Sequence, residues 1–140
     1  MTITFTVPGA AKGKGRPRFA RAGNFVRTYT PEETARRENL VALLYRQVAP
    51  GVPPHDGPVA LEIHADYLLP ASWPKKKRDA MDGQPKTSKP DVDNVGKLVL
   101  DGLNGIAWTD DALVADCVVR KRWGRSDEMR ISITRHGKET

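Results

Sequence analysis

Alternation of apolar and polar positions predicts β-strands at both ends of the chain and in its middle. Residues 2–7 alternate, and residues 25–29, 112–123 and 129–134 are also expected to form strands. The clearest strand spans residues 59–69, and the residues expected on its buried face are Val59, Leu61, Ile63, Ala65, Tyr67 and Leu69. Glu62 and His64 then belong to the opposite face, because side chains alternate along a strand.

Apolar residues at helical spacing predict three helices between these strands. The first spans about 30–48 and begins with an N-cap threonine, a proline at the first position and two acids in the first turn. We expect its core-facing residues to be Leu40, Leu43, Leu44 and Val48. A short basic helix covers about 72–81, and a central helix covers about 91–104 before an Asn-Gly stop signal.

The order β, β, α, β, α, α, β, β predicts an α/β (α+β) fold: one domain over residues 1–140, with one mixed sheet packed by two or three helices. It lacks the regular βαβ alternation of a doubly wound fold. Residues 13–15 satisfy neither a P-loop nor a dinucleotide fingerprint, so we expect no nucleotide cofactor. The basic segment 11–30 is expected to be mobile or ordered by a ligand, and 83–89 to be a flexible loop.

The central helix carries a polar face beside its apolar one. Residues on the apolar arc, at 100° per residue, are Val95, Leu98, Val99, Leu100, Gly102 and Leu103. Asp93 and Lys97 lie one turn apart on the other side. Asp91 lies at the helix start, where backbone donors favour an anion. With the acidic pair 110–111, four carboxylates and a lysine fall within about twenty residues.

Each of these acids also has a structural explanation. The sequence before Asp91 resembles a capping box, and Asp93 with Lys97 is compatible with a surface ion pair worth a few tenths of a kcal/mol. The acidic pair 110–111 is compatible with turn chemistry. The spacing therefore supports an oxygen site for a hard cation without excluding structural roles.

Basic residues cluster around this acidic centre in a chain of net charge +6. Residues 11–30 contain six basic residues and no acid, and further clusters lie at 75–89 and 120–125. This distribution indicates a polyanionic partner such as nucleic acid. The residues expected to hold DNA phosphates are Lys12, Lys14, Arg16, Arg18, Arg21, Arg27, Lys75, Lys76, Lys77 and Lys89.

Membranes and disulfide chemistry find no support in the sequence. No segment approaches 18 consecutive apolar residues, and residues 1–7 alternate instead of forming a signal peptide. The single cysteine, Cys117, cannot form an internal disulfide and is expected to fill a strand position. We therefore expect no membrane partner and a cytoplasmic protein.

The central motif resembles the RusA family of Holliday junction resolvases. The residues that carry this resemblance are KPDVDN at 89–94, Lys97, LDGLNG at 100–105 and the acidic pair 110–111. The runs VPG at 7–9, KGRPR at 14–18 and YTP at 29–31 resemble the opening of that family. The resemblance covers nearly the whole chain, and its central block is specific because several spaced positions agree.

The resemblance implies a Mg²⁺-dependent endodeoxyribonuclease, with Mn²⁺ as a substitute, that cuts four-way DNA junctions as a homodimer during recombination and repair. By motif position, Asp91, Asp93 and Asp111 would be the metal-binding and catalytic carboxylates. Lys97 would be the active-site lysine. Asp110 would lie outside the metal ligands or shape the turn.

Two other functions stay open at this point. One is a metal nuclease that acts on flaps, forks or RNA. The other is a non-catalytic protein that binds branched nucleic acid and uses its acidic residues structurally. Three acids contributing to one site argue against the second function.

Overall fold

The computed structural model describes residues 1–12, 18–22, 25–29 and 32–137, with no side chains described between 13 and 31. In chain order the elements are β1 (Thr2–Pro8), β2 (Arg18–Ala22), β3 (Phe25–Tyr29), α1 (Glu32–Val48), β4 (Val59–Leu68), α2 (Lys75–Met81), α3 (Val92–Leu103), a 3₁₀ turn (Asp111–Leu113), β5 (Val114–Gly124) and β6 (Glu128–Arg135). The expected α+β class and all three helices are confirmed. The strand β2 was not expected.

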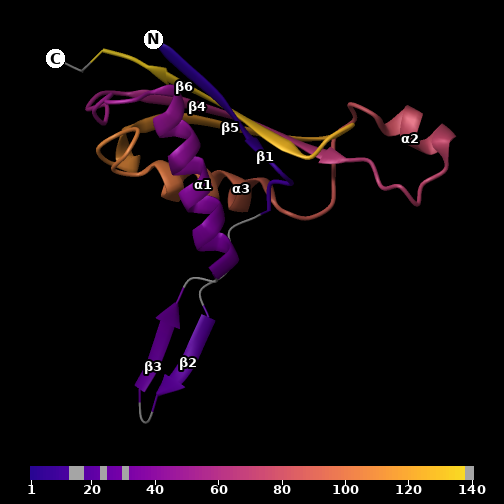
Figure 1. Cartoon of the computed structure of the whole chain (residues 1–140), viewed down its shortest axis with the longest axis horizontal. Coiled ribbons are helices and arrows are strands. Elements are labelled where there is room, and N and C mark those ends of the chain that lie inside the picture. Colours follow the sequence, from indigo (N-terminus) through magenta and orange to yellow (C-terminus); the bar gives the residue numbers. More distant parts are fainter. Residues whose placement is uncertain (13–17, 23–24, 30–31, 138–140) are drawn as a thin grey trace.

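A mixed four-stranded sheet forms the body of the protein, in the order β1-β6-β4-β5. β4 and β5 are parallel, whereas β6 is antiparallel to both β1 and β4. Parallel neighbours need a long crossover, and here the connection from β4 to β5 contains α2 and α3. Figure 1 shows α1 and α3 on one face of this sheet, with α2 on an arm beyond its end.

The two remaining strands form a separate sheet. β2 and β3 pair antiparallel with each other, and Arg18 lies opposite Tyr29 in their register. Figure 1 shows this hairpin apart from the four-stranded sheet. The expectation of a single sheet is therefore correct for the body of the fold but omits this hairpin.

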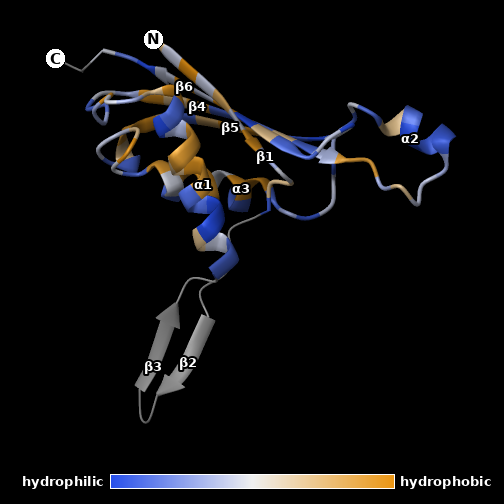
Figure 2. Ribbon diagram, in the orientation of Figure 1, coloured by the Kyte–Doolittle hydropathy of each residue, from blue (hydrophilic) through white to orange (hydrophobic). Residues whose placement is uncertain are grey.

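The core lies between the sheet and the two helices. The inward residues of β4 are buried as the alternation predicts, and Glu62 on the opposite face binds Arg120 and His64. Figure 2 shows hydrophobic residues gathered where α1 and α3 face the sheet, whereas α2 is mostly hydrophilic. Both observations follow from hydrophobic burial on one face of an open sheet.

The predicted core face of α1 is correct only in part, because Leu40 and Leu44 are partly buried against the core whereas Leu43 and Val48 are not. Leu43 is 51% exposed and Val48 is 49% exposed, whereas Val41 and Tyr45 are fully buried. Val41 and Tyr45 are four residues apart, so they share one face, and the ring of Tyr45 packs edge-on against Phe5 of β1. The aromatic residue in this helix decides which side faces the sheet.

α3 packs closely against α1 at Gly102. A Cβ atom at this position would lie 3.0 Å from the backbone carbonyl oxygen of Glu38. The buried residues of α3 are those predicted from the helical period, apart from Leu100, which is partly buried at the edge. The central helix is therefore held tightly, with its polar face free to carry chemistry.

Candidate active site

The N-terminal end of α3 presents two exposed carboxylates. Asp91 is the N-cap residue, but its side chain makes no capping hydrogen bond, so the capping-box interpretation does not account for this carboxylate. Lys89 Nζ lies 2.9 Å from Asp91 Oδ2. Asp93 follows in the first turn, where the positive end of the helix dipole favours negative charge.

Two lysines bind the backbone that leads into this end of α3. Lys121 Nζ donates to the carbonyl oxygens of Ser88, at 2.7 Å, and Pro90, at 2.6 Å. Lys86 Nζ donates to Ser88 Oγ at 2.6 Å and to the carbonyl oxygen of Lys89. Three consecutive carbonyl groups therefore accept hydrogen bonds from ammonium groups.

Lys86 is itself packed between aromatic rings. Its Nζ lies 5.0 Å from the ring centres of Tyr67 and Trp123. Burial lowers the pKa of Lys86, and the nearby charge of Lys121 lowers this pKa further. Two lysines are thus held close together, and the charge of Lys121 disfavours the charged form of Lys86.

The segment 83–89, expected to be a flexible loop, is bound along the edge of β5. Gly83 N donates to Trp123 O and Trp123 N donates to Gln84 O, both at 2.9 Å, and Lys86 N donates to Lys121 O at 3.1 Å. Backbone pairing with a strand edge satisfies donors that a free loop would leave to water. The route into Asp91 is therefore tied to the sheet at several points.

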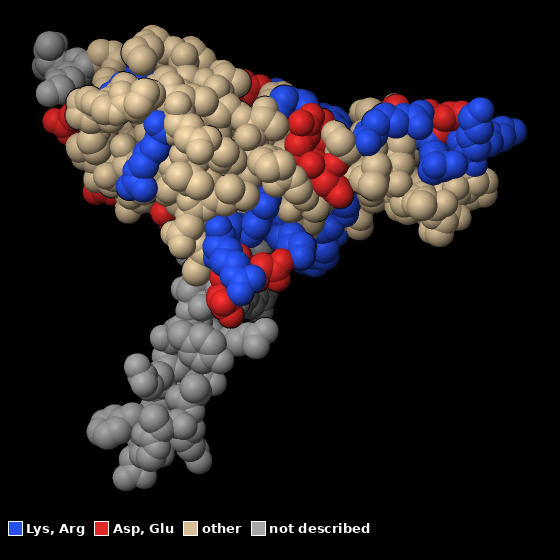
Figure 3. Space-filling model, in the orientation of Figure 1, with Lys and Arg blue, Asp and Glu red and all other residues tan. Residues whose placement is uncertain are grey.

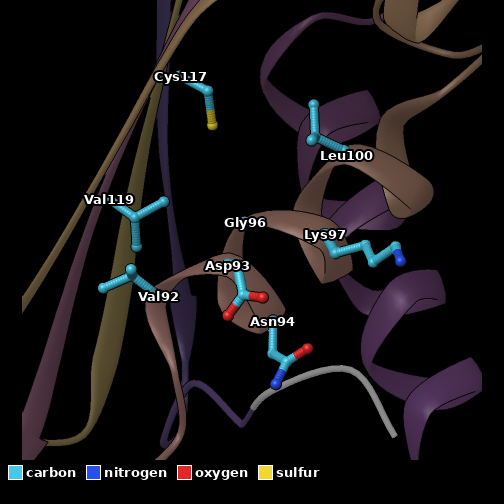
Figure 4. A pocket seen from close by; sticks show the side chains of 8 residues that line it. All are labelled: Val92, Asp93, Asn94, Gly96, Lys97, Leu100, Cys117 and Val119. Atoms are coloured by element: carbon cyan, nitrogen blue, oxygen red, sulfur yellow. The ribbon is translucent and has the colours of Figure 1, made fainter. Parts of the chain in front are cut away.

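An open groove of about 600 Å³ lies between α3 and β5. Its lining residues are Val92, Asp93, Asn94, Gly96, Lys97, Leu100, Cys117 and Val119 (Figure 4). Gly96 permits the close approach of helix and strand, because a Cβ there would lie 3.3 Å from Val119 Cγ2. Cys117 fills a strand position of β5, as expected.

Asp93 and Lys97 both line this groove, but they do not form a salt bridge in the described part of the chain. Figure 4 shows the Lys97 side chain extending away from Asp93. The interpretation of these residues as an ordinary surface ion pair is therefore wrong. Both charges are exposed and available to a ligand.

A second acidic group lies at the C-terminal end of α3. Trp108 Nε1 donates to Asp111 Oδ1 at 2.8 Å, and Asp111 N donates to Oδ1 of Asn104, the C-cap residue, at 3.0 Å. Asp110 caps the short 3₁₀ turn by accepting from Ala112 N. Asp110 thus shapes the turn, and Asp111 is held by a buried indole and an amide.

The carboxyl of Asp111 is poorly stabilised in its charged form. Burial raises its pKa, and the negative charges of Asp101 and Asp110 raise it further, against the hydrogen bond from Trp108, which lowers it. These effects require Asp101 and Asp110 to lie near Asp111. A cation bound here would relieve the repulsion among the three acids.

The two acidic groups are separated by the length of α3. Asp93 is the second residue of this 12-residue helix, and Asp111 binds the residue that ends it. At about 1.5 Å per residue, the two ends lie about 16 Å apart. In the described ranges, no three His, Cys, Asp or Glu side chains are grouped to hold a metal. One subunit therefore does not bring Asp91, Asp93 and Asp111 together.

The carboxylates expected to bind a divalent cation therefore lie at two different ends of α3. Asp91 and Asp93 supply exposed carboxylate oxygens, the donors that Mg²⁺ prefers, and Mg²⁺ is commonly held by one or two carboxylates, water and a substrate phosphate. Asp111 does not join them within one chain. The donor chemistry fits, but the expected cluster of three does not form in the single subunit.

The basic residues proposed for DNA lie on several parts of the surface. Lys14, Arg16 and the side chains of Arg18, Arg21 and Arg27 lie outside the described residues. Lys12 forms an ion pair with Glu33 at 2.6 Å. Figure 3 shows acidic residues between two groups of basic ones on this face of the molecule. No helix in the described ranges is long and apolar enough to cross a bilayer.

α2 carries three of these lysines on an arm. The helix buries none of its residues, and Lys77 Nζ lies 4.1 Å from the ring centre of Trp73, which packs against Trp123. Arg125 binds Asp79 and Asp82 of the same arm. Lys75 and Lys76 are exposed, so the arm presents positive charge on a base fixed to the sheet.

Sequence reasoning missed the residues that hold the acids in place. Trp108 had no assigned role, Asn104 was expected only to end the central helix, and Lys86 and Lys121 were counted only in basic clusters. One signal was available for Lys121. In the alternation of β5, this lysine occupies an inward position beside apolar residues, a local conflict that often marks a functional region.

Comparison with known proteins agrees with the resemblance of the central motif. The model of the family described as Endodeoxyribonuclease RusA matches residues 8–134. The chain is also 35% identical over 135 residues to a Bacillus subtilis (strain 168) protein named "Uncharacterized protein YqaN", with 94% of this chain and 93% of that protein covered. This chain therefore belongs to the RusA family of endodeoxyribonucleases.

Proposed function

We propose that the protein is a divalent-metal-dependent endodeoxyribonuclease that resolves four-way DNA junctions by paired phosphodiester hydrolysis. Its metal would be Mg²⁺, with Mn²⁺ as a substitute, and it would act as a cytoplasmic homodimer in recombination and repair. The observation that carries the proposal is a pair of exposed carboxylates at the N-terminal end of α3, in a chain of this family. They belong to Asp91, whose side chain does not cap the helix, and to Asp93 in the first turn.

Asp91 and Asp93 would hold the cation from the N-terminal end of α3. When bound, a divalent cation supplies charge neutralisation at the phosphate and a water that ionises near neutral pH. Both carboxylates are exposed, so a DNA phosphate can approach them from solvent. The helix dipole at this end also favours the phosphate.

Lys97 would bind the phosphate that is cut. Its ammonium is exposed in the groove beside Asp93 and makes no salt bridge in the described ranges, so it can meet the negative charge that develops during hydrolysis. A positioned charge of this kind typically contributes about 10²–10³ in rate.

A homodimer would unite the two acidic groups. A two-fold axis across α3 reverses the direction of the helix, so the N-terminal end of one α3 faces the C-terminal end of the other. Asp91 and Asp93 of one subunit would then lie near the acidic end of the partner's α3, although about 16 Å separates the two ends within one helix. We propose that Asp111 of the partner subunit completes the site formed by Asp91 and Asp93, which gives two equal sites for two symmetric cuts.

The exposed apolar surface beside α3 is consistent with such a partner. Val92 is exposed at the groove, and the inner side of that groove is lined by Leu100 and Val119. Large apolar side chains that stay in contact with water often mark an interface. Burial of this surface would contribute to holding the two α3 helices across the axis.

The basic arm would hold the DNA outside the site. Lys75, Lys76 and Lys77 lie on α2, and Lys89 lies beside Asp91. Contacts from lysines to phosphates fix the position of DNA without reading its sequence. The arm would therefore orient the junction relative to the carboxylates.

The test compares cleavage and binding by the wild type and Asp93→Asn. We expect the wild type in Mg²⁺ to cut a synthetic four-way junction symmetrically, and faster than a fork or a linear duplex. Asp93→Asn should lose at least about 10²-fold in cleavage and bind the junction at least as tightly, since a negative charge near phosphate is removed. A protein that binds the junction but never cuts it in Mg²⁺ or Mn²⁺ would be the non-catalytic alternative.

A further inference from the structure

Lys121 occupies a position where the fold expects an apolar residue. In the sheet register it stands beside Ala65, in one row with Met129 and Val7, and these three residues are fully buried. Lys121 itself is only 9% exposed. Burial of an ammonium group is costly unless it is well hydrogen-bonded.

The partners of this ammonium are backbone carbonyls instead of carboxylates. Nζ of Lys121 donates to the oxygens of Ser88 and Pro90, at 2.7 and 2.6 Å. Charge-assisted hydrogen bonds of this length are among the stronger ones in proteins. The lysine thus fixes the Ser88–Lys89 and Pro90–Asp91 peptide groups, which lie just before the start of α3.

The residues fixed in this way are those that direct the carboxylates. Pro90 immediately precedes Asp91, and Asp91 O accepts from Val95 N at 3.2 Å in the first hydrogen bond of α3. A shift of the Pro90 carbonyl would therefore move Asp91 and loosen the first turn, which contains Asp93. The stem of Lys121 is anchored in the central sheet, so the constraint is a rigid one.

We propose that Lys121 is a positioning residue of the active site, which sets the direction of Asp91 and Asp93 by binding the carbonyls of Ser88 and Pro90. The inference rests on the proposed metal-dependent function, and it assigns Lys121 no contact with DNA or cation. Partners that orient metal ligands typically change metal affinity by about 10–100-fold when they are removed.

The decisive variant is Lys121→Met, which keeps the length of the side chain and removes its donors. We expect Mn²⁺ binding to the DNA-free protein, measured by titration calorimetry, to weaken at least about 10-fold. Binding to a four-way junction without divalent metal should change by less than about twofold. Lys121→Arg, which can still donate to both carbonyls, should recover most of the Mn²⁺ affinity.

A stability control separates positioning from general loosening of the fold. Ile133→Val removes one methylene from the buried core of β6, away from α3, and is expected to lower stability without changing Mn²⁺ affinity. If Lys121→Met fails to fold, Lys86→Met provides the second variant, because it removes the ammonium that binds Lys89 O. We expect it to weaken Mn²⁺ binding at least about 10-fold, as is typical of partners that orient metal ligands.

A metal-free measurement distinguishes failure of this inference from failure of the proposed function. Hydrogen exchange at the Val95 amide should be faster in Lys121→Met than in the wild type, and unchanged in Ile133→Val. If the wild type binds no Mn²⁺, the metal-dependent function is wrong, and the exchange result alone tests the positioning role. Wild-type Mn²⁺ affinity and wild-type exchange in folded Lys121→Met would overturn the inference.

Discussion

The two ends of α3 hold their acids in opposite ways. At the N-terminal end, two buried or half-buried ammonium groups bind the backbone, and the carboxylates of Asp91 and Asp93 stay exposed. At the C-terminal end, Trp108 donates to the Asp111 carboxylate, Asn104 accepts from the Asp111 backbone N–H, and the neighbours of Asp111 are acidic. The N-terminal end thus has lysines next to its acids, whereas the charged neighbours of Asp111 at the C-terminal end are acids.

This difference shows why neither end is a complete site. The N-terminal end can offer exposed carboxylates to a cation and a phosphate. Lys86 and Lys121 bind the backbone there, and Lys89 pairs with Asp91. The C-terminal end accumulates negative charge that raises the pKa of Asp111. In the proposed two-fold dimer, the acids of one end would lie beside those of the other end from the partner subunit, and the following predictions test this arrangement.

The largest expected effect is a loss of junction cleavage when an acid at either end of α3 is replaced. If both belong to one site, Asp111→Asn should reduce junction cleavage about as severely as Asp93→Asn, by roughly 10²–10³-fold. Asn at 111 can still accept from Trp108, so the local geometry is kept. Single-turnover cleavage rates of the two purified variants give the comparison, and near-normal cleavage by Asp111→Asn would remove the C-terminal end from the site.

A smaller effect is expected in packing at the two ends. Gly102→Ala should destabilise the fold by about 1–3 kcal/mol, since the new Cβ would lie 3.0 Å from a backbone oxygen that cannot move alone. The new Cβ of Gly96→Ala would meet side-chain atoms instead of backbone, Val119 Cγ2 at 3.3 Å and Cys117 Sγ at 3.9 Å, and the substitution gains helix propensity. We expect it to be within about 1 kcal/mol of wild type. Urea unfolding of both variants measures the difference.

The basic arm gives a third prediction, specific to the N-terminal end. Replacement of Lys75, Lys76 and Lys77 by Gln should weaken junction binding and make it less sensitive to salt. Each lost phosphate contact lowers the slope of log affinity against log salt by about 0.9. Binding titrations at several salt concentrations report this slope. An unchanged slope would mean that α2 does not contact DNA.

The smallest expected effect is a gain in stability at the C-terminal end. The raised pKa of Asp111 means that its ionisation disfavours the folded state, so Asp111→Asn should be slightly stabilising without metal. Below about pH 4 both side chains are neutral and the gain should vanish. It should grow as pH rises and level off above the raised pKa. Thermal unfolding across pH in a chelating buffer tests this sign.

Much of the fold could be predicted from the sequence because its patterns are local. The helical period of residues 95–103 and the alternation of 59–67 both agree with the observed burial. The core face of α1 was mispredicted because Leu43 and Val48 are apolar yet exposed, while Tyr45 is the residue that packs on the sheet. Tertiary contact, which periodicity does not contain, decides between such faces.

The residues of the candidate site could be predicted from the sequence, but their positions in space could not. The motif located Asp91, Asp93 and Asp111 within about twenty residues, yet the intervening helix converts that closeness in sequence into separation in space. Lys121 was not predicted as a buried residue, because a charged residue on a strand is normally assigned to solvent. Contacts between β5 and residues 83–90 are long-range and left no local pattern.

The most direct test of the proposed shared site is a mixed dimer of Asp93→Asn and Asp111→Asn subunits, isolated with two different affinity tags. If each site takes Asp93 from one subunit and Asp111 from the other, one site in this dimer is intact. We predict that it nicks one strand of a four-way junction in Mg²⁺, whereas both parent homodimers are inactive. A mixed dimer that is as inactive as its parents would contradict the shared site.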